Sequence, residues 1–249
     1  MNPRLALRHC QVELLGQLRE PGYLVQALIF PTMFFLFFGV AIAGNTIEAN
    51  LVLASYATYA FLGVVFIQYT GGIAQSRQMK WEAFLRTLPA SYSHRFVGWS
   101  LSGLIIGIVS LALVAATAFV TTGASAGVEE WLFLGLALLF GSTTMALVAM
   151  VFGYWLRPGI AVPISNVVYL SLAYAGGLWT SPEDLPEWLQ HISPFLPTRL
   201  WAELAWASVQ SQAWPLEHTL GLLAYLVMAA VMTRWGYLRV YRQRHGHAA

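Results

Sequence analysis

Six long apolar runs decide what this chain can fold into. A helix needs about 20 apolar residues to cross roughly 30 Å of hydrocarbon, and each run is close to that length or longer. Only 10% of the residues are charged, against roughly 25% in a soluble domain, so water is not the solvent for most of this chain. The predicted membrane spans are residues 23–43, 51–74, 96–120, 131–155, 160–179 and 216–237.

The basic residues predict which side of the membrane each connection occupies. With six crossings, twelve of the thirteen arginine and lysine residues fall on one side and Arg199 falls on the other, together with most of the acidic residues. Basic residues are enriched in cytoplasmic loops. We therefore predict a multi-pass protein of the inner (cytoplasmic) cell membrane with both termini in the cytoplasm.

The connection 75–95, predicted to be cytoplasmic, is too long to be a simple turn. Trp81, Phe84, Leu85 and Leu88 follow one another at the spacing of one helical face. The sequence predicts a short amphipathic helix here. Two roles stay open: docking of a partner protein, or lying on the lipid headgroups.

The connection 180–214, predicted to be external, is divided by four prolines into short pieces such as 185–192 and 198–209. Neither piece is long enough to span the bilayer. We expect this region to lie in the outer interface or to enter it as paired half-helices. The apolar face of the second piece consists of Leu200, Trp201, Leu204 and Ala205.

The spans contain no aspartate, glutamate, lysine, arginine or histidine at membrane depth. This disfavours proton- or sodium-driven transport, because such carriers usually place charged groups there. A phosphate-binding P-loop ends in Gly-Lys-Ser or Gly-Lys-Thr, and the single lysine, Lys80, follows a methionine. Cys10 is the single cysteine, and His94, His191 and His218 are scattered. We predict no catalytic site and no metal site in this chain.

A few polar side chains lie within the predicted spans. Gln68, Thr70, Asn166 and Tyr169 are candidates for lining a substrate pathway. Hydrogen bonding between helices is the alternative role for these side chains.

Several local features occur in an informative order. An Arg19-Glu20-Pro21 run leads into an aromatic first span with Phe30-Pro31, the cytoplasmic stretch 77–89 follows the second span, and a Ser-Pro-Phe-Leu-Pro run at 193–197 precedes the last one. In this order they resemble the ABC type 2 transporter permeases, the membrane subunits of exporters whose ATPase is a separate chain. The resemblance covers essentially the whole length.

The resemblance implies a role for each non-spanning segment. The stretch after the second span would be the coupling helix, which fits a cleft on the ATPase, with Glu82 as its acidic residue. The connecting helix of the family would fall on residues 3–18, and its external half-helices on 185–209. The implied ATPase-coupling residues are Arg77, Lys80, Trp81, Glu82, Phe84, Leu85, Arg86 and Leu88.

The sequence thus predicts an all-α polytopic membrane protein, with one domain over 1–249 comprising an N-terminal segment 1–21, a six-span region 22–237 and a tail 238–249. The resemblance implies a non-enzymatic export permease for an apolar or amphipathic cargo, such as a drug, a lipid or a lipid-linked glycan. Its partners would be an ABC ATPase that holds ATP and magnesium, a second permease copy and membrane lipid, with no cofactor of its own and no nucleic acid. The alternatives are a sensor or resistance module working with a two-component system, and a membrane-embedded enzyme or assembly factor.

Overall fold

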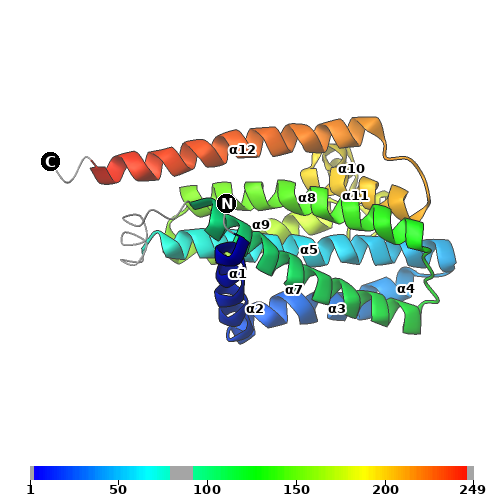
Figure 1. The fold of residues 1–249 in the computed structure, drawn as a ribbon. Helices are drawn as coiled ribbons and strands as arrows, with labels where there is room; N and C mark the ends of the chain where they lie inside the picture. Colours follow the sequence, from blue (N-terminus) through cyan, green and yellow to red (C-terminus); the bar gives the residue numbers. More distant parts are fainter. Residues whose placement is uncertain (1–2, 79–91, 246–249) are drawn as a thin grey trace.

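The computed structural model describes residues 3–78 and 92–245, and within those ranges it contains helices and no strand (Figure 1). The predicted all-α class is confirmed. Six helical spans are long and apolar enough to cross a membrane, as predicted. They are Pro21–Ile42, Thr46–Ser76 (α5), Phe96–Thr121 within α7 (Tyr92–Thr121), Val128–Trp155 (α8), Pro158–Ala175 (α9) and Leu216–Val240 within α12 (Leu216–His245).

Helix α5 is the centre of the bundle. It packs against α7, α8, α9 and the short helix α11 (Pro197–Val209), and Figure 1 shows it running along the middle of the molecule. Nearly nine-tenths of its most apolar stretch is buried. A helix that is apolar on all faces belongs in such a central position. The last span, α12, packs on α8 and α11 instead.

The first span is a continuous rod built from short segments of different helical pitch. It consists of α2 (Pro21–Leu24), a π-helical turn at Val25–Ile29, α3 (Phe30–Phe34), a second π-helical turn at Phe35–Gly39 and α4 (Val40–Ile42). Inserted π turns are a recognised response to interruptions of the regular hydrogen-bond ladder.

Pro31 is one such interruption. Proline has no backbone N–H, so the carbonyl of Ala27 loses its usual partner four residues later. The hydroxyl of Ser110, on α7, donates a hydrogen bond to that carbonyl at 2.6 Å. Both Ala27 and Ser110 are fully buried, so a neighbouring helix satisfies the group that the proline leaves free.

Helix α1 (Pro3–Leu18) lies across the spans at one end of the bundle and packs against α7 (Figure 1). Its buried residues include Ala6 and Cys10, and the chain at His9 and Cys10 approaches α7 closely because Gly98 has no side chain there. The indole Nε1 of Trp99 donates to Glu13 Oε2 at 2.7 Å. Small and polar residues therefore form this contact.

Helix α11 enters the bundle, where it packs against α5, α8 and α12. Both predicted helical pieces are confirmed, as α10 (Glu187–Ile192) and α11. The four residues of the predicted apolar face are all buried. Trp201 is the largest of them: its indole Nε1 donates to the carbonyl of Ala137 on α8 at 2.9 Å, and its ring lies over Gly141.

Candidate functional site

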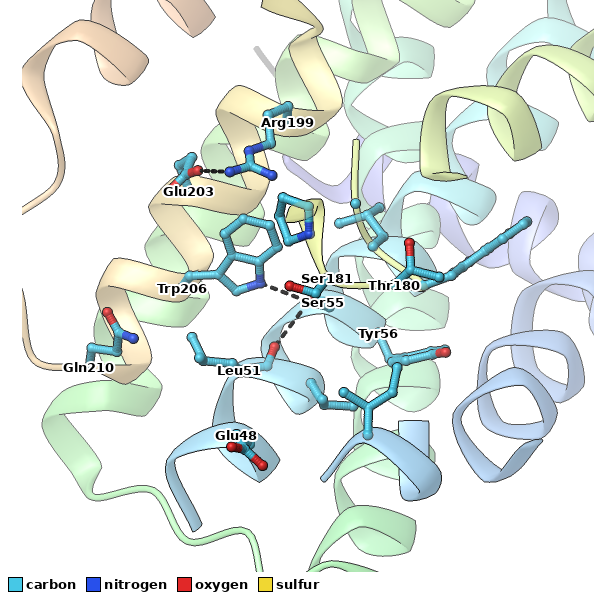
Figure 2. Close-up of a pocket in the computed structure, with 16 residues that line it drawn as sticks. Glu48, Leu51, Ser55, Tyr56, Thr180, Ser181, Arg199, Glu203, Trp206 and Gln210 are labelled. Carbon is cyan, nitrogen blue, oxygen red and sulfur yellow. Dashed lines mark hydrogen bonds and ion pairs between the residues drawn. The ribbon is translucent and has the colours of Figure 1, made fainter. Parts of the chain in front are cut away.

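A cavity of about 340 Å³ opens at the end of the bundle where α4 ends and α5 begins. Figure 1 shows this end away from both termini, and Figure 2 shows the cavity itself. Its walls come from α4, α5, the segment after α9, and α11. The lining residues are Ile42, Glu48, Leu51, Val52, Ser55, Tyr56, Gly177, Leu178, Trp179, Thr180, Ser181, Pro182, Arg199, Glu203, Trp206 and Gln210.

The turn after α9 brings one wall of the cavity into place. Gly177 adopts a left-handed φ of 75°, and the backbone N–H of Leu178 donates to the carbonyl of Ala173 at 3.0 Å. This is the pattern of a glycine-terminated helix end. The fifth span therefore ends at Ala175, earlier than the predicted residue 179, and the chain that follows forms the cavity wall.

The charged groups of the cavity are held in place by other groups of the same chain. On α11 the guanidinium Nη2 of Arg199 lies 2.5 Å from Glu203 Oε1. The Cζ atom of Arg199 lies 4.9 Å from the ring centroid of Trp206. Glu48, which is exposed at the rim, accepts a hydrogen bond from the backbone N–H of Gly44 at 2.9 Å. The half-buried charges of the cavity thus form a compensated ion pair.

Trp206 connects α11 to the central helix. Its indole Nε1 donates to the hydroxyl of Ser55 at 2.7 Å, and that hydroxyl donates to the carbonyl of Leu51 at 3.0 Å. Figure 2 shows this chain of hydrogen bonds across the floor of the cavity. The position of the Trp206 ring is therefore fixed relative to α5.

An aromatic cluster continues from the cavity into the bundle. The ring of Trp179 packs edge-on against Tyr59, with 5.4 Å between centroids, and lies 5.0 Å from the ring of Phe34. Tyr59, about one helical turn further along α5 than Tyr56, stacks on Tyr169 with 6.2 Å between centroids. Ring contacts thus join the cavity to one of the four residues predicted to line a pathway.

The other three predicted pathway residues lie elsewhere in the bundle. Gln68 donates from Nε2 to the carbonyl of Trp99 at 2.8 Å and to the Ser102 hydroxyl at 3.1 Å. Thr70 donates to the carbonyl of Ala149 at 3.0 Å. Gln68 and Thr70 therefore bond α5 to α7 and α8, whereas Asn166 is half-buried on α9. Their part in a pathway stays a prediction.

The coupling prediction falls mostly outside the described residues. Arg77 is described: its Nη1 donates to the carbonyls of Gly153 and Leu156 at 3.0 and 2.8 Å, which anchors the end of α5 to the end of α8. Basic side chains often bind the last carbonyls of a helix in this way. The other predicted coupling residues, Lys80, Trp81, Glu82, Phe84, Leu85, Arg86 and Leu88, lie outside the described residues.

Sequence reasoning missed the polar residues of the cavity. Arg199, Glu203 and Trp206 follow the i, i+4, i+7 spacing of one helix face, on the side away from the predicted apolar face. That spacing could have identified them as a unit. Nothing in the sequence pairs Trp206 with Ser55, since the two are 151 positions apart. Among the described residues no group of three metal-ligating side chains occurs.

The fold defines a class, the multi-pass helical membrane proteins. Comparison with known proteins gives the family. The chain belongs to the ABC-2 type transporter family, whose sequence profile matches residues 9–208. A relative in Bacillus subtilis (strain 168), named transport permease YvfS in a description that is itself provisional, is 25% identical over 223 residues, covering 88% of this chain and 91% of the relative.

Proposed function

We propose that this chain is the membrane subunit of an ATP-driven exporter that moves an apolar or amphipathic cargo across the inner membrane. A separate ABC ATPase, which holds ATP and magnesium, would supply the energy, and a second permease copy would complete the pathway between subunits. Family membership supports the ATPase partner in general terms. The cargo class follows from the interior of the bundle.

The observation that carries the proposal is the composition of the buried interior. Among the described residues, the buried polar side chains include those of serine, threonine, glutamine and tyrosine, and no buried side chain is an aspartate, glutamate, lysine, arginine or histidine. Ion-driven carriers usually place carboxylates, histidines or basic groups within the membrane. A bundle without them supports energy supply from a partner and a cargo that needs no buried counter-charge.

The anchoring of Arg77 supports contact between the ATPase and the predicted coupling segment. Because its side chain bonds to the end of α8, the predicted coupling segment leaves the bundle from a point fixed to two spans. A push on that segment by a closing ATPase would reach α5, and α5 contacts the first span as well as α7, α8, α9 and α11. This geometry suits transmission of force from the cytoplasmic side to the cavity.

The experiment is co-purification of the full chain with its ABC ATPase from membranes, with ATPase activity as the second readout. In the test variant Trp81, Glu82 and Leu85 are all changed to alanine. The matched control changes Glu187, Trp188 and Ile192, an acidic, a tryptophan and an aliphatic residue exposed together on α10, to alanine.

We expect a stoichiometric complex with the unchanged chain and with the α10 variant. The 81/82/85 variant should lose the complex or fail to stimulate ATP hydrolysis while still eluting as a folded membrane protein. Absence of any ATPase complex with the unchanged chain would contradict the exporter proposal. Equal binding and activity of both triple variants would contradict the coupling assignment alone.

A further inference from the structure

Three polar side-chain atoms on the wall of the cavity have no hydrogen-bond partner within the part of the chain that the structure describes. They are the indole Nε1 of Trp179, the hydroxyl Oγ1 of Thr180 and the phenol oxygen of Tyr56, and all three atoms are buried. Native proteins leave few buried polar atoms unpaired, and each one needs an explanation. Three on residues that line one cavity favour a ligand with polar groups at this place.

The chemistry of these atoms specifies the kind of group that would pair with them. An indole N–H can only donate, and the two hydroxyl groups can donate as well as accept. The partner of Trp179 must therefore be a hydrogen-bond acceptor. In Figure 2 Tyr56 and Thr180 lie on one side of the cavity, opposite Trp206 and Arg199, so these two hydroxyl-bearing residues are on the side away from the ion pair.

The charges of the cavity argue against an ionic ligand. Arg199 is already paired with Glu203 and packs on the ring of Trp206. Glu48 is exposed at the rim, so a charged ligand that moved past it into the cavity would lose hydration without gaining a free partner there, which is costly. An uncharged acceptor, such as an ester or amide carbonyl, meets the unpaired donors without that cost.

The remaining walls suit an apolar body. Ile42, Leu51, Val52 and Leu178 line the cavity beside the two tryptophan rings. A volume of about 340 Å³ lies in the range of small-molecule sites, which combine apolar walls with a few placed polar groups. The cavity would therefore hold one end of an amphipathic molecule rather than a bare ion or a water-soluble metabolite.

We propose that this cavity binds the uncharged, carbonyl-bearing end of an amphipathic molecule, with Trp179 Nε1 and the Thr180 hydroxyl donating to its oxygen atoms and the apolar residues holding its chain. Binding at this cavity does not depend on the proposed export function. Only the interpretation of the cavity as a binding site on the cargo route rests on that function. Either an exported amphiphile or an outer-leaflet lipid ester could supply this chemistry.

The test uses the full chain, without any ATPase, in nanodiscs of phosphatidylcholine. The probe is a monoacylglycerol that carries a photoactivatable diazirine on its acyl chain, and the comparison probe is an alkyltrimethylammonium with the same chain and diazirine. The readouts are the half-saturation concentration of crosslinking and the peptides that are labelled. The variants are Trp179→Phe, which keeps an aromatic ring but loses the donor, and Thr180→Val, which keeps the shape but loses the hydroxyl.

We expect the monoacylglycerol to label the cavity segments 177–182 and 197–209, with the half-saturation concentration raised about tenfold by Trp179→Phe and severalfold by Thr180→Val. The control Trp188→Phe, on the exposed face of α10, should leave it unchanged. The ammonium probe should not label the cavity saturably. Equal half-saturation in the unchanged chain and both variants, or labelling confined to other segments, would overturn the proposal.

Two further outcomes separate the sources of the ligand. In nanodiscs of ether-linked phosphatidylcholine, which lacks ester carbonyls, a lower half-saturation concentration would identify outer-leaflet lipid esters as competing occupants. An equal value would identify a site that selects the free amphiphile. Because no ATPase is present, a failure of the exporter proposal leaves these measurements interpretable, and a failure of the site leaves the ATPase complex unaffected.

Discussion

Gly141 on α8 provides a sharp test of how α11 is held in the bundle. A Cβ atom at this position would lie closer than 3.0 Å to the nearest atoms of the Trp201 indole, a separation that real Cβ atoms essentially never show. The ring cannot simply move aside, because Trp201 is fully buried and its Nε1 is bonded to the carbonyl of Ala137. The substitution Gly141→Ala must therefore displace α11 or distort α8.

The expected cost combines three contributions. Overpacking a filled core costs about 1–3 kcal/mol, and loss of the indole hydrogen bond adds about 0.5–1.5 kcal/mol. Alanine offsets about 0.5–1 kcal/mol of this cost because it is more favourable than glycine inside a helix. We expect a net destabilisation of roughly 1–3 kcal/mol, which corresponds to a fall in the apparent melting temperature of roughly 2–12 °C for a chain of this size.

The assay is thermal unfolding of the detergent-solubilised chain, followed by the loss of its monodisperse peak in size-exclusion chromatography at one fixed heating time. Gly135→Ala is the matched control, since it lies on the same helix and a Cβ there meets nothing within 4 Å. It should melt at or above the temperature of the unchanged chain. Combining Gly141→Ala with Trp201→Leu should cost less than the sum of the two single changes. If Gly141→Ala has the same melting temperature as Gly135→Ala, the described packing of α11 against Gly141 is wrong.

Three other changes test particular contacts. Ser110→Ala leaves the Ala27 carbonyl unpaired inside the bundle and should lower stability by about 1 kcal/mol; an unchanged melting temperature would mean that another group replaces the hydroxyl. Burial raises the pKa of the Cys10 thiol, so less thiolate is present at pH 8. Maleimide should therefore react at least about tenfold more slowly with the folded chain than with the chain unfolded in sodium dodecyl sulfate. Equal rates would contradict the packing of α1 on α7. Asn50→Ala removes the side chain that donates to the Ser125 carbonyl at 2.7 Å and accepts from its N–H at 2.9 Å, so amide hydrogen exchange in residues 122–127 should accelerate. Exchange as slow as in the unchanged chain would show that this loop is held by other contacts.

The spans were predictable because crossing a bilayer depends on a local property. The apolar length of each run sets whether a helix can span, and each predicted run coincides with a helix of the structure within a few residues at most ends. The breaks in the 180–214 connection were predictable for the same reason, since proline acts on its own turn of the chain. The helices at Glu187–Ile192 and Pro197–Val209 begin and end near those prolines.

The packing of α1 shows where a prediction from the sequence pattern fails. The test for an amphipathic helix counts large apolar side chains on one face. In α1 the buried residues are small or polar, and several large ones, including Leu7 and Val12, are exposed. Contact with α7 depends on the absence of a side chain at Gly98, in a distant helix.

The sequence alone determined the helical class, the number of spans and the division of the 180–214 connection, because each depends on the composition of a short stretch of chain. Only the tertiary structure decided that α5 is central, that α11 is seated on Gly141, and that Ser55, Trp179 and Trp206 share a cavity. These are contacts between residues far apart in the chain. They are set by which surfaces fit together when all the helices pack at once, and no single segment carries that information.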